Sequence, residues 1–489
     1  MADKLKQLYN IVVLKCEVTD ARVSVQFTLQ AKLDGALTDL HTWSSTLGEL
    51  GLQYDCRSGI DARLPQTLVA DVNLWMRQNA ADTQPLWIHL VKPYGALRLM
   101  PWERAFGLDF PHAILMLPDF IFPPPRESAA TLDIALCASA PLDTEEHWLR
   151  NALVPAIARI LEAQVRSTRV HVFTDAVLQP VVRDAFTVAG TLDSRIIVYD
   201  GEFAAPYAAT DPTSRLMDSA GQLRSPWLLW MRAALKQQSI DVAHFVGHGY
   251  LTRDRGALLL AQSPLERTDE YLAGPVGSIE LSTFLTQIGA WGTVFTAVLQ
   301  NNSEPGLRAL ADEIAQCRPG PLLMHVVQHD QEQIMLPAAY RVLFDTTPAS
   351  MPRSPSLFLY CQPYRVQGSE PGQYEVGAST RSRGHLRMDS PVARSAHQSR
   401  VAEAVNALPS ALDRVFDGGA PVKSWVAATE RVAEQAQLRI QTSSRDDADD
   451  EWTQNFRDVA TMSVLDSLRE SVAEYAAEDV GRESPGGAA

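Results

Sequence analysis

Two short apolar runs near the middle of the chain end in polar residues that could carry chemistry. The first, residues 240–246, leads to His248, whose imidazole could act as a general base. The second, residues 294–299, leads to the amide of Asn302 and to Ser303, a hydroxyl that such a base could activate. Runs of this kind are typical of strands buried in a parallel sheet, and ligands bind beyond the carboxyl ends of such strands. We therefore predict that the two runs are strands whose ends form one site.

Neighbouring residues are expected to form the rim of this site. A glycine on each side of the histidine would allow close backbone approach and unusual dihedral angles. A third apolar run, residues 321–327, ends just before another histidine and an aspartate, which should reach the same edge of the sheet. The predicted rim consists of Gly247, Gly249, Asn301, His329 and Asp330.

Histidine spacing also suggests a metal site, which we weigh against a structural role. His244 with His248, and His325 with His329, have the four-residue spacing that places two zinc ligands on one face of a helix. Both pairs fall at predicted strand ends, where such residues are about 13 Å apart, and neither pair includes the glutamate of HExxH. We therefore predict no metal and no cofactor, and interpret His244 as a hydrogen-bonded core histidine.

An alternation of strands and helices is expected to position these residues. From residue 131 to residue 344, short apolar runs alternate with segments of helical spacing, which is typical of crossover units. This pattern predicts an α/β fold with a doubly wound, mostly parallel sheet flanked by helices. The preceding segment is mixed, with strands predicted near residues 10–16, 24–30 and 86–90 and a helix at residues 64–79.

Composition divides the chain into five parts. Three consecutive prolines, Pro123 to Pro125, cannot continue a helix or a central strand and therefore mark a boundary. An edge strand is predicted at residues 357–361, followed by a linker rich in Pro, Ser, Gly and Arg. The predicted parts are a mixed α+β segment (1–125), an α/β domain (126–366), the linker (367–396), a C-terminal helical region (397–480) and a disordered tail (481–489).

Charge and composition exclude several classes of protein. A net charge of -15 and a pI near 5.2 disfavour a general nucleic-acid or anionic-membrane surface. No apolar run reaches the roughly 18 residues that span a bilayer, and the first residues lack the features of a signal peptide. The five widely spaced cysteines form neither a disulfide framework nor a metal knuckle. We expect a cytoplasmic protein whose C-terminal helices bind a protein partner or a second copy of the chain.

The histidine segment resembles a known family. His-Phe-Val-Gly-His-Gly, residues 244–249, is similar to the histidine motif of the CHAT domain, a family with a caspase-like cysteine peptidase fold. Residues 298–303, Val-Leu-Gln-Asn-Asn-Ser, stand where that family has a nucleophile strand that usually ends in Leu-x-x-Cys. The interval from His248 to Asn302 is similar to the roughly 50 residues between histidine and cysteine in caspase-type sites. Leu86-Trp87 and Pro101-Trp102-Glu103 resemble the segment that precedes such domains, so the resemblance covers about residues 85–344.

The sequence departs from that family at the nucleophile. Asn302 occupies the cysteine position, and an amide can neither be deprotonated near neutral pH nor form an acyl-enzyme. Ser303 is the alternative nucleophile, although a shift of one residue points its side chain elsewhere. Cys317 stands at the far end of the next predicted helix, about 20 Å away, and cannot reach the site. A deliberate inactivating replacement is a further explanation, for which alanine or serine is the usual choice.

The resemblance therefore implies a caspase-like protein without its thiol. It implies a pseudo-peptidase that acts as a regulatory or assembly subunit in bacterial stress or antiviral signalling, with a peptide ligand in the degenerate cleft. Two alternatives remain open at this point. One is an active endopeptidase that uses His248 with Ser303, and the other is a ligand-sensing module that uses the cleft as a pocket.

Overall fold

A computed structural model places most of the first three quarters of the chain. The predicted linker, C-terminal helices and tail lie outside the described residues, and so does the Pro123–Pro125 boundary. The structure describes residues 9–367 except for 20–23, 34–35, 53–61, 93, 108, 119–130, 140–145, 164–165, 176–177, 209–222, 236–239, 253–254, 266–272, 299–302, 319 and 346.

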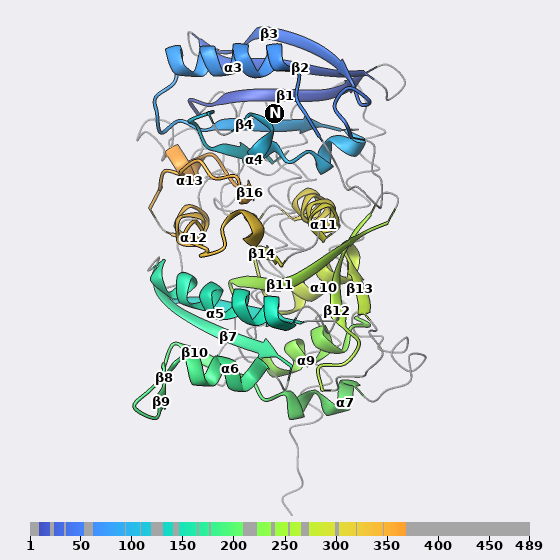
Figure 1. Ribbon diagram of the computed structural model, residues 1–489, viewed down its shortest axis with the longest axis vertical. Helices are drawn as coiled ribbons and strands as arrows, with labels where there is room; N and C mark the ends of the chain where they lie inside the picture. Colours follow the sequence, from blue (N-terminus) through green and yellow to red (C-terminus); the bar gives the residue numbers. More distant parts are fainter. Residues whose placement is uncertain are drawn as a thin grey trace, which may run out of the picture.

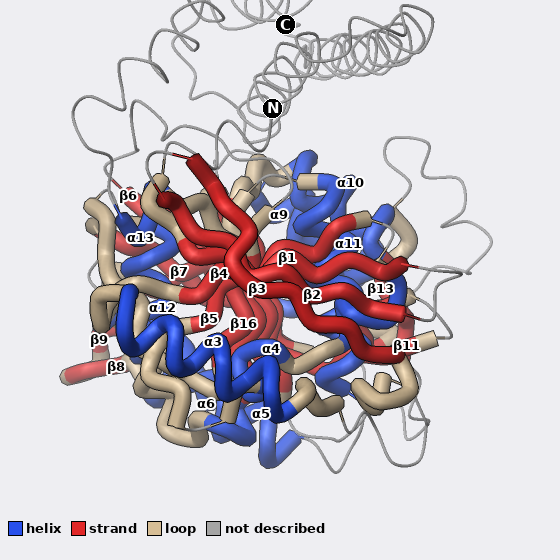
Figure 2. Tube along the Cα trace, turned by 90° about the horizontal axis from the view of Figure 1, so that it is seen from above, coloured by secondary structure: helices blue, strands red, loops and turns tan. Residues whose placement is uncertain are grey.

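One large, mostly parallel mixed sheet runs along the length of the described molecule (Figure 1). β12 (Gly256–Ala261) and β13 (Ala273–Gly277) branch from β11, and β8 (Thr187–Val188) with β9 (Thr191–Leu192) forms a separate hairpin. The sheet twists along its length, so that the strands fan out when viewed from above (Figure 2). In spatial order the strands of the main path are β10 (Ile196–Val198), β7 (Ser167–Thr174), β6 (Thr131–Ala138), β11 (Val242–Leu251), β14 (Gly292–Ala297), β15 (Leu322–Val326), β16 (Leu357–Tyr360), β5 (Ile114–Met116), β4 (Leu86–Val91), β1 (Val12–Thr19), β2 (Ser24–Leu33) and β3 (Ala36–Thr46).

Helices cover both faces of the sheet, because alternate residues of each buried strand point to opposite sides. In β11, Phe245 packs into one core and Val246 into the other. The first core contains residues of α3 (Gln66–Asn79), α4 (Trp102–Ala105), α9 (Pro226–Leu235), α10 (Ser278–Gln287) and α11 (Ser303–Cys317). The second contains residues of α5 (Glu146–Glu162), α6 (Leu178–Ala185) and α12 (Leu336–Phe344). The α/β fold with a mostly parallel sheet flanked by helices is therefore confirmed.

The remaining helical elements are short. They are η1 (Gly95–Leu99), η3 (Gly201–Ala204), α7 (Ala205–Ala208), η4 (Val327–His329) and α13 (Tyr364–Gln367). Among the described residues, no helix is both long and apolar enough to cross a membrane.

The prediction of an edge strand at residues 357–361 is wrong. β16 lies inside the sheet, antiparallel to β15 and parallel to β5, and all four of its residues are buried. Its apolar sequence suits burial on both faces, but its second neighbour comes from more than 200 residues earlier in the chain. β5 meets β16 through the register pair Met116–Tyr360, so the N-terminal segment and the predicted α/β domain share one continuous sheet.

The sequence does not predict the long strand β3. It is the edge strand of the sheet, and most of its described residues are exposed or half-buried, so polar side chains occur on both of its faces. The apolar signal that identifies buried strands is therefore weak there.

Candidate functional site

His248 lies where β11 leaves the parallel part of the sheet. Gly247 forms the last pair with β14, opposite Ala297, and His248 pairs instead with Leu259 of the antiparallel strand β12. The strand therefore continues to Leu251, and the prediction that His248 follows the end of its strand is wrong in this detail. The histidine is nevertheless at the carboxyl edge of the parallel sheet, and it is almost fully buried.

The two glycines beside His248 differ in their surroundings. A Cβ on Gly249 would overlap the Ser303 carbonyl oxygen and would lie 2.5 Å from the Leu307 backbone nitrogen. A Cβ on Gly247 would lie 3.5 Å from the Ser139 carbonyl oxygen, which is an ordinary contact. Neither glycine has a positive φ. The predicted close backbone approach is therefore confirmed at Gly249, and the predicted unusual dihedral angles are wrong at both positions.

Ser303 begins α11 and is hydrogen-bonded to the strand that carries His248. Its buried Oγ accepts a hydrogen bond of 2.8 Å from the Gly249 backbone N–H. Because the Cβ direction of Gly249 points into α11, the preceding side chain, that of His248, leaves the opposite face of the strand. The structure thus places Ser303 against the strand that carries His248, but it directs the hydroxyl to a backbone amide and the imidazole to the other face.

The predicted nucleophile position lies outside the described residues. Asn301 and Asn302 belong to residues 299–302, between the described ends of β14 and α11. Cys317 is the last residue of the fifteen-residue helix α11, so a regular helix places it about 20 Å from the start. The prediction that Cys317 cannot reach the site is consistent with this length.

Asp330 and His329 have different environments at the end of β15. Asp330 is buried, its Oδ2 lies 3.2 Å from Nε2 of His325, and it accepts the backbone N–H groups of Ile334 and Met335. Burial opposes ionisation of Asp330, but the hydrogen bonds from His325 and from the backbone outweigh it and lower the pKa. His329 is exposed and ends the turn η4, so the prediction that it lies on a strand end is wrong. Of the two predicted rim residues, His329 faces solvent and Asp330 supports the turn into α12.

His244 is a core histidine, as predicted. Its Nδ1 lies 2.8 Å from the Tyr340 hydroxyl and its Nε2 lies 2.8 Å from the Thr296 hydroxyl. Complete burial, together with the nearby His325, lowers the pKa of His244 to about 3, so the ring is neutral. The described part of the chain contains no group of three or more His, Cys, Asp or Glu side chains that could hold a metal ion.

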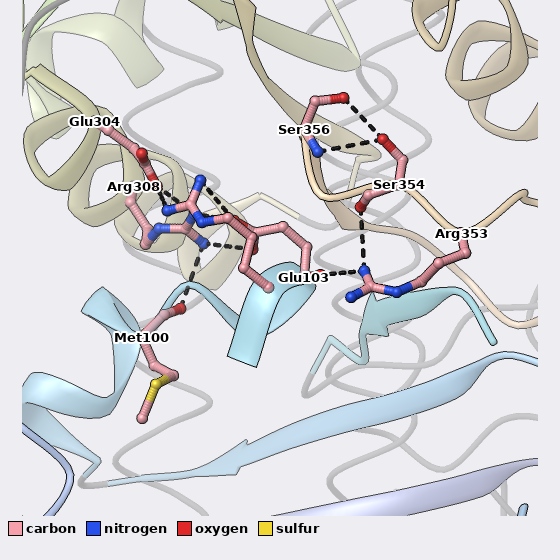
Figure 3. Close-up of polar contacts among 8 residues, drawn as sticks. Met100, Glu103, Glu304, Arg308, Arg353, Ser354 and Ser356 are labelled. Atoms are coloured by element: carbon pink, nitrogen blue, oxygen red, sulfur yellow. Dashed lines mark hydrogen bonds and ion pairs between the residues drawn. The ribbon is translucent and has the colours of Figure 1, made fainter. Parts of the chain in front are cut away.

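A buried ion cluster at the start of α11 was not foreseen from the sequence. Arg308 makes two hydrogen bonds to Glu103, of 2.6 and 3.1 Å, and one of 2.9 Å to Glu304 (Figure 3). Arg104 donates to Glu304 at 2.5 Å. Burial opposes ionisation of Glu304, but Arg308 and Arg104 outweigh it and hold its pKa at about 2. The i, i+4 spacing of Glu304 and Arg308 is a readable helix signal, whereas nothing in the sequence pairs Arg308 with Glu103.

The charges of the cluster also act on His329. Partial burial and the charge of Arg104 lower the pKa of His329, while the carboxylates of Glu103 and Glu304 act against that shift. The carboxyl edge of β11, β14 and β15 therefore combines a buried histidine, a helix start bonded to the histidine strand, and a charged rim. None of the described groups at this edge provides an activated nucleophile. No model of a known protein family matches this chain, and no curated protein sequence matches it.

Proposed function

We propose that this protein has a caspase-like fold of the CHAT type and has lost peptidase activity, so that it works as a regulatory or assembly subunit. The observation that carries the proposal is the hydrogen bond from the Gly249 N–H to Ser303 Oγ. Through this bond, the Ser303 hydroxyl, next to Asn302 in the sequence, holds the first turn of α11 against the strand of His248. The residue that could replace the missing thiol is thus engaged in support of the fold.

The chemistry of the remaining groups agrees with this proposal. A cysteine peptidase needs a thiolate that a histidine or another cation stabilises, and Asn302 offers an amide in its place. Loss of the nucleophile from such a pair lowers kcat by orders of magnitude. His248 would then line a peptide-binding cleft without taking part in bond cleavage.

The proposed role is binding rather than hydrolysis. A peptide segment of a partner would occupy the cleft, and the C-terminal helical region would bind a protein partner or a second copy. Bacterial stress or antiviral signalling in the cytoplasm is the setting that the CHAT resemblance suggests. Neither a metal nor a cofactor is part of the proposal.

Restoring the thiol tests the proposal directly. We expect wild-type protein to leave a panel of unfolded protein substrates uncleaved, and N302C to cleave them if the geometry of the site is preserved. The matched control N301C carries the same thiol one residue earlier and should be inactive, as should the double variant N302C/H248A. Product fragments are measured by mass spectrometry at pH 7.5.

An active serine-type peptidase is the competing function. It predicts that the wild-type protein already cleaves substrate and that both H248A and S303A abolish the cleavage. Such a result would refute the loss of activity. If N302C and the wild type are both inactive, a peptide that binds wild type and not a variant altered at the proposed cleft, such as H248W, would still support the binding role. Absence of any peptide binding in that case would refute it.

A further inference from the structure

We infer that Glu103 and Arg308 are positioning residues, through which the N-terminal segment holds α11 and the His248–Gly249 backbone in place. The contacts that carry this inference lie on two sides of one helix. They exist whether or not the site cleaves a peptide bond.

One side of α11 is a polar stripe that faces the N-terminal segment. Glu304, Arg308, Asp312 and Gln316 recur at the i, i+4 spacing that places side chains on one helix face. The Tyr94 hydroxyl donates to Asp312, with 2.9 and 3.0 Å to its two oxygens. The partners of the stripe come from residues 94–104 and from β16, whose Tyr360 hydroxyl donates to Asp312 at 2.7 Å.

The ion pair at the centre of this stripe is buried. The side chains of Arg308 and Glu103 are 1% and 2% exposed, and their two hydrogen bonds fix both the distance and the orientation of the guanidinium group. The same group donates to the Met100 carbonyl oxygen (Figure 3). It also lies 4.4 Å from the centre of the Phe358 ring in β16. Removing the charge of Glu103 would leave the buried Arg308 with only one of its two carboxylate partners, which is destabilising.

The other side of α11 touches the strands of the site with no intervening side chain. A Cβ on Gly306 would lie 2.5 Å from the Tyr250 backbone nitrogen, and a Cβ on Gly256 would overlap the Gly306 carbonyl oxygen. Gly249 makes the third contact of this kind, with Ser303 and Leu307. Three glycines therefore let the backbone of the helix rest directly on the β11–β12 hairpin.

These two sides make α11 a rigid connection between the N-terminal segment and the site. Flexible side chains could absorb a shift of the helix, but backbone atoms in direct contact cannot. A displacement of α11 relative to the hairpin would strain or break the bond between Ser303 Oγ and the Gly249 N–H. The N-terminal segment is thus part of the site's support, and a ligand that moves this segment would alter the site.

Hydrogen exchange of the full chain tests the inference at Gly249. The loss of global stability in E103Q is measured first, and it predicts a certain increase in the exchange rate of the peptide that contains residues 247–251. We expect the observed rate to exceed that predicted rate by at least about tenfold. The control V172A creates a cavity in β7, distant from α11, and should lower stability without this local excess. The control E313Q is on the same helix as Arg308 and removes the 3.2 Å ion pair between Glu313 and Arg98 of η1. It should leave the exchange rate of residues 247–251 unchanged.

A milder variant keeps the test decisive if E103Q does not fold. E103D retains the charge but shortens the side chain, so the two hydrogen bonds to Arg308 cannot both form at the same backbone positions. It should show the same local excess at residues 247–251 to a smaller extent. In V172A, exchange at residues 247–251 should follow global stability. The same behaviour in E103Q would refute the proposed positioning role. If E103Q does not fold, the same behaviour in E103D would refute it.

Discussion

Replacing Gly249 with alanine should destabilise the protein far more than replacing Gly247, although both glycines flank His248. At position 249 the new methyl group would overlap the Ser303 carbonyl oxygen and lie 2.5 Å from the Leu307 nitrogen, so α11 would have to withdraw by about 1 Å. Backbone atoms of a packed helix cannot rotate away as a flexible side chain can. Overpacking of this kind costs about 1–3 kcal/mol, and the buried Gly249 N–H to Ser303 bond would be weakened as well.

The matched variant separates this steric effect from the general effect of losing a glycine. In G247A the nearest atom to the new methyl group is 3.5 Å away, which is an ordinary van der Waals distance. Replacement of glycine by alanine at such a site is neutral or stabilises by about 0.4–1 kcal/mol, because the unfolded chain loses conformational freedom.

Thermal unfolding measured by circular dichroism would distinguish the two variants. Because residues 9–367 share one continuous sheet, each kcal/mol corresponds to roughly 1–2 °C in Tm. We therefore expect G249A to unfold a few degrees below wild type and G247A to unfold at the wild-type Tm or up to about 2 °C above it. Equal Tm values for G249A and wild type, or an equal loss in both variants, would refute the direct backbone contact between α11 and β11.

Two further predictions concern the core and the division of the chain. The buried His244, whose pKa is about 3 in the fold, should make stability fall as pH drops below its unfolded pKa near 6.5, by about 1.4 kcal/mol per pH unit. The urea midpoint should therefore fall less between pH 7.5 and pH 5.5 in H244Q than in wild type, and an identical fall would contradict this. Residues 126–366 expressed alone should be insoluble, because β16 loses β5 and Arg308 loses Glu103. Co-expression with residues 1–125 should restore a soluble complex, whereas a soluble, cooperatively folding 126–366 fragment would show that the N-terminal segment is dispensable.

Local patterns were sufficient for much of the fold. The apolar runs at residues 240–246 and 294–299 correspond to β11 and β14, with ends displaced by a few residues. Buried parallel strands and amphipathic helices leave their periodicity in neighbouring residues, so a single sequence reveals them. The core role of His244 followed from the same kind of information, since an isolated histidine within an apolar run is usually buried and hydrogen-bonded.

Predictions that depended on distant partners were less successful. The sequence predicts β16 at an edge because its second neighbour in the sheet, β5, belongs to the N-terminal segment, which composition separates from the α/β domain. The local sequence of β16 is compatible with an edge or a central position, and only packing against the rest of the molecule selects one.

The candidate site shows the same division between local and tertiary information. The sequence alone determined that a histidine follows an apolar run, that glycines flank it, and that amide side chains follow the second apolar run. Only the tertiary structure decided that Gly249 accommodates a helix backbone, that Ser303 holds the histidine strand, and that Glu103 pairs with Arg308 across 205 residues. Periodicity records which face of an element is buried, whereas the identity of the buried neighbour depends on how all the elements pack together.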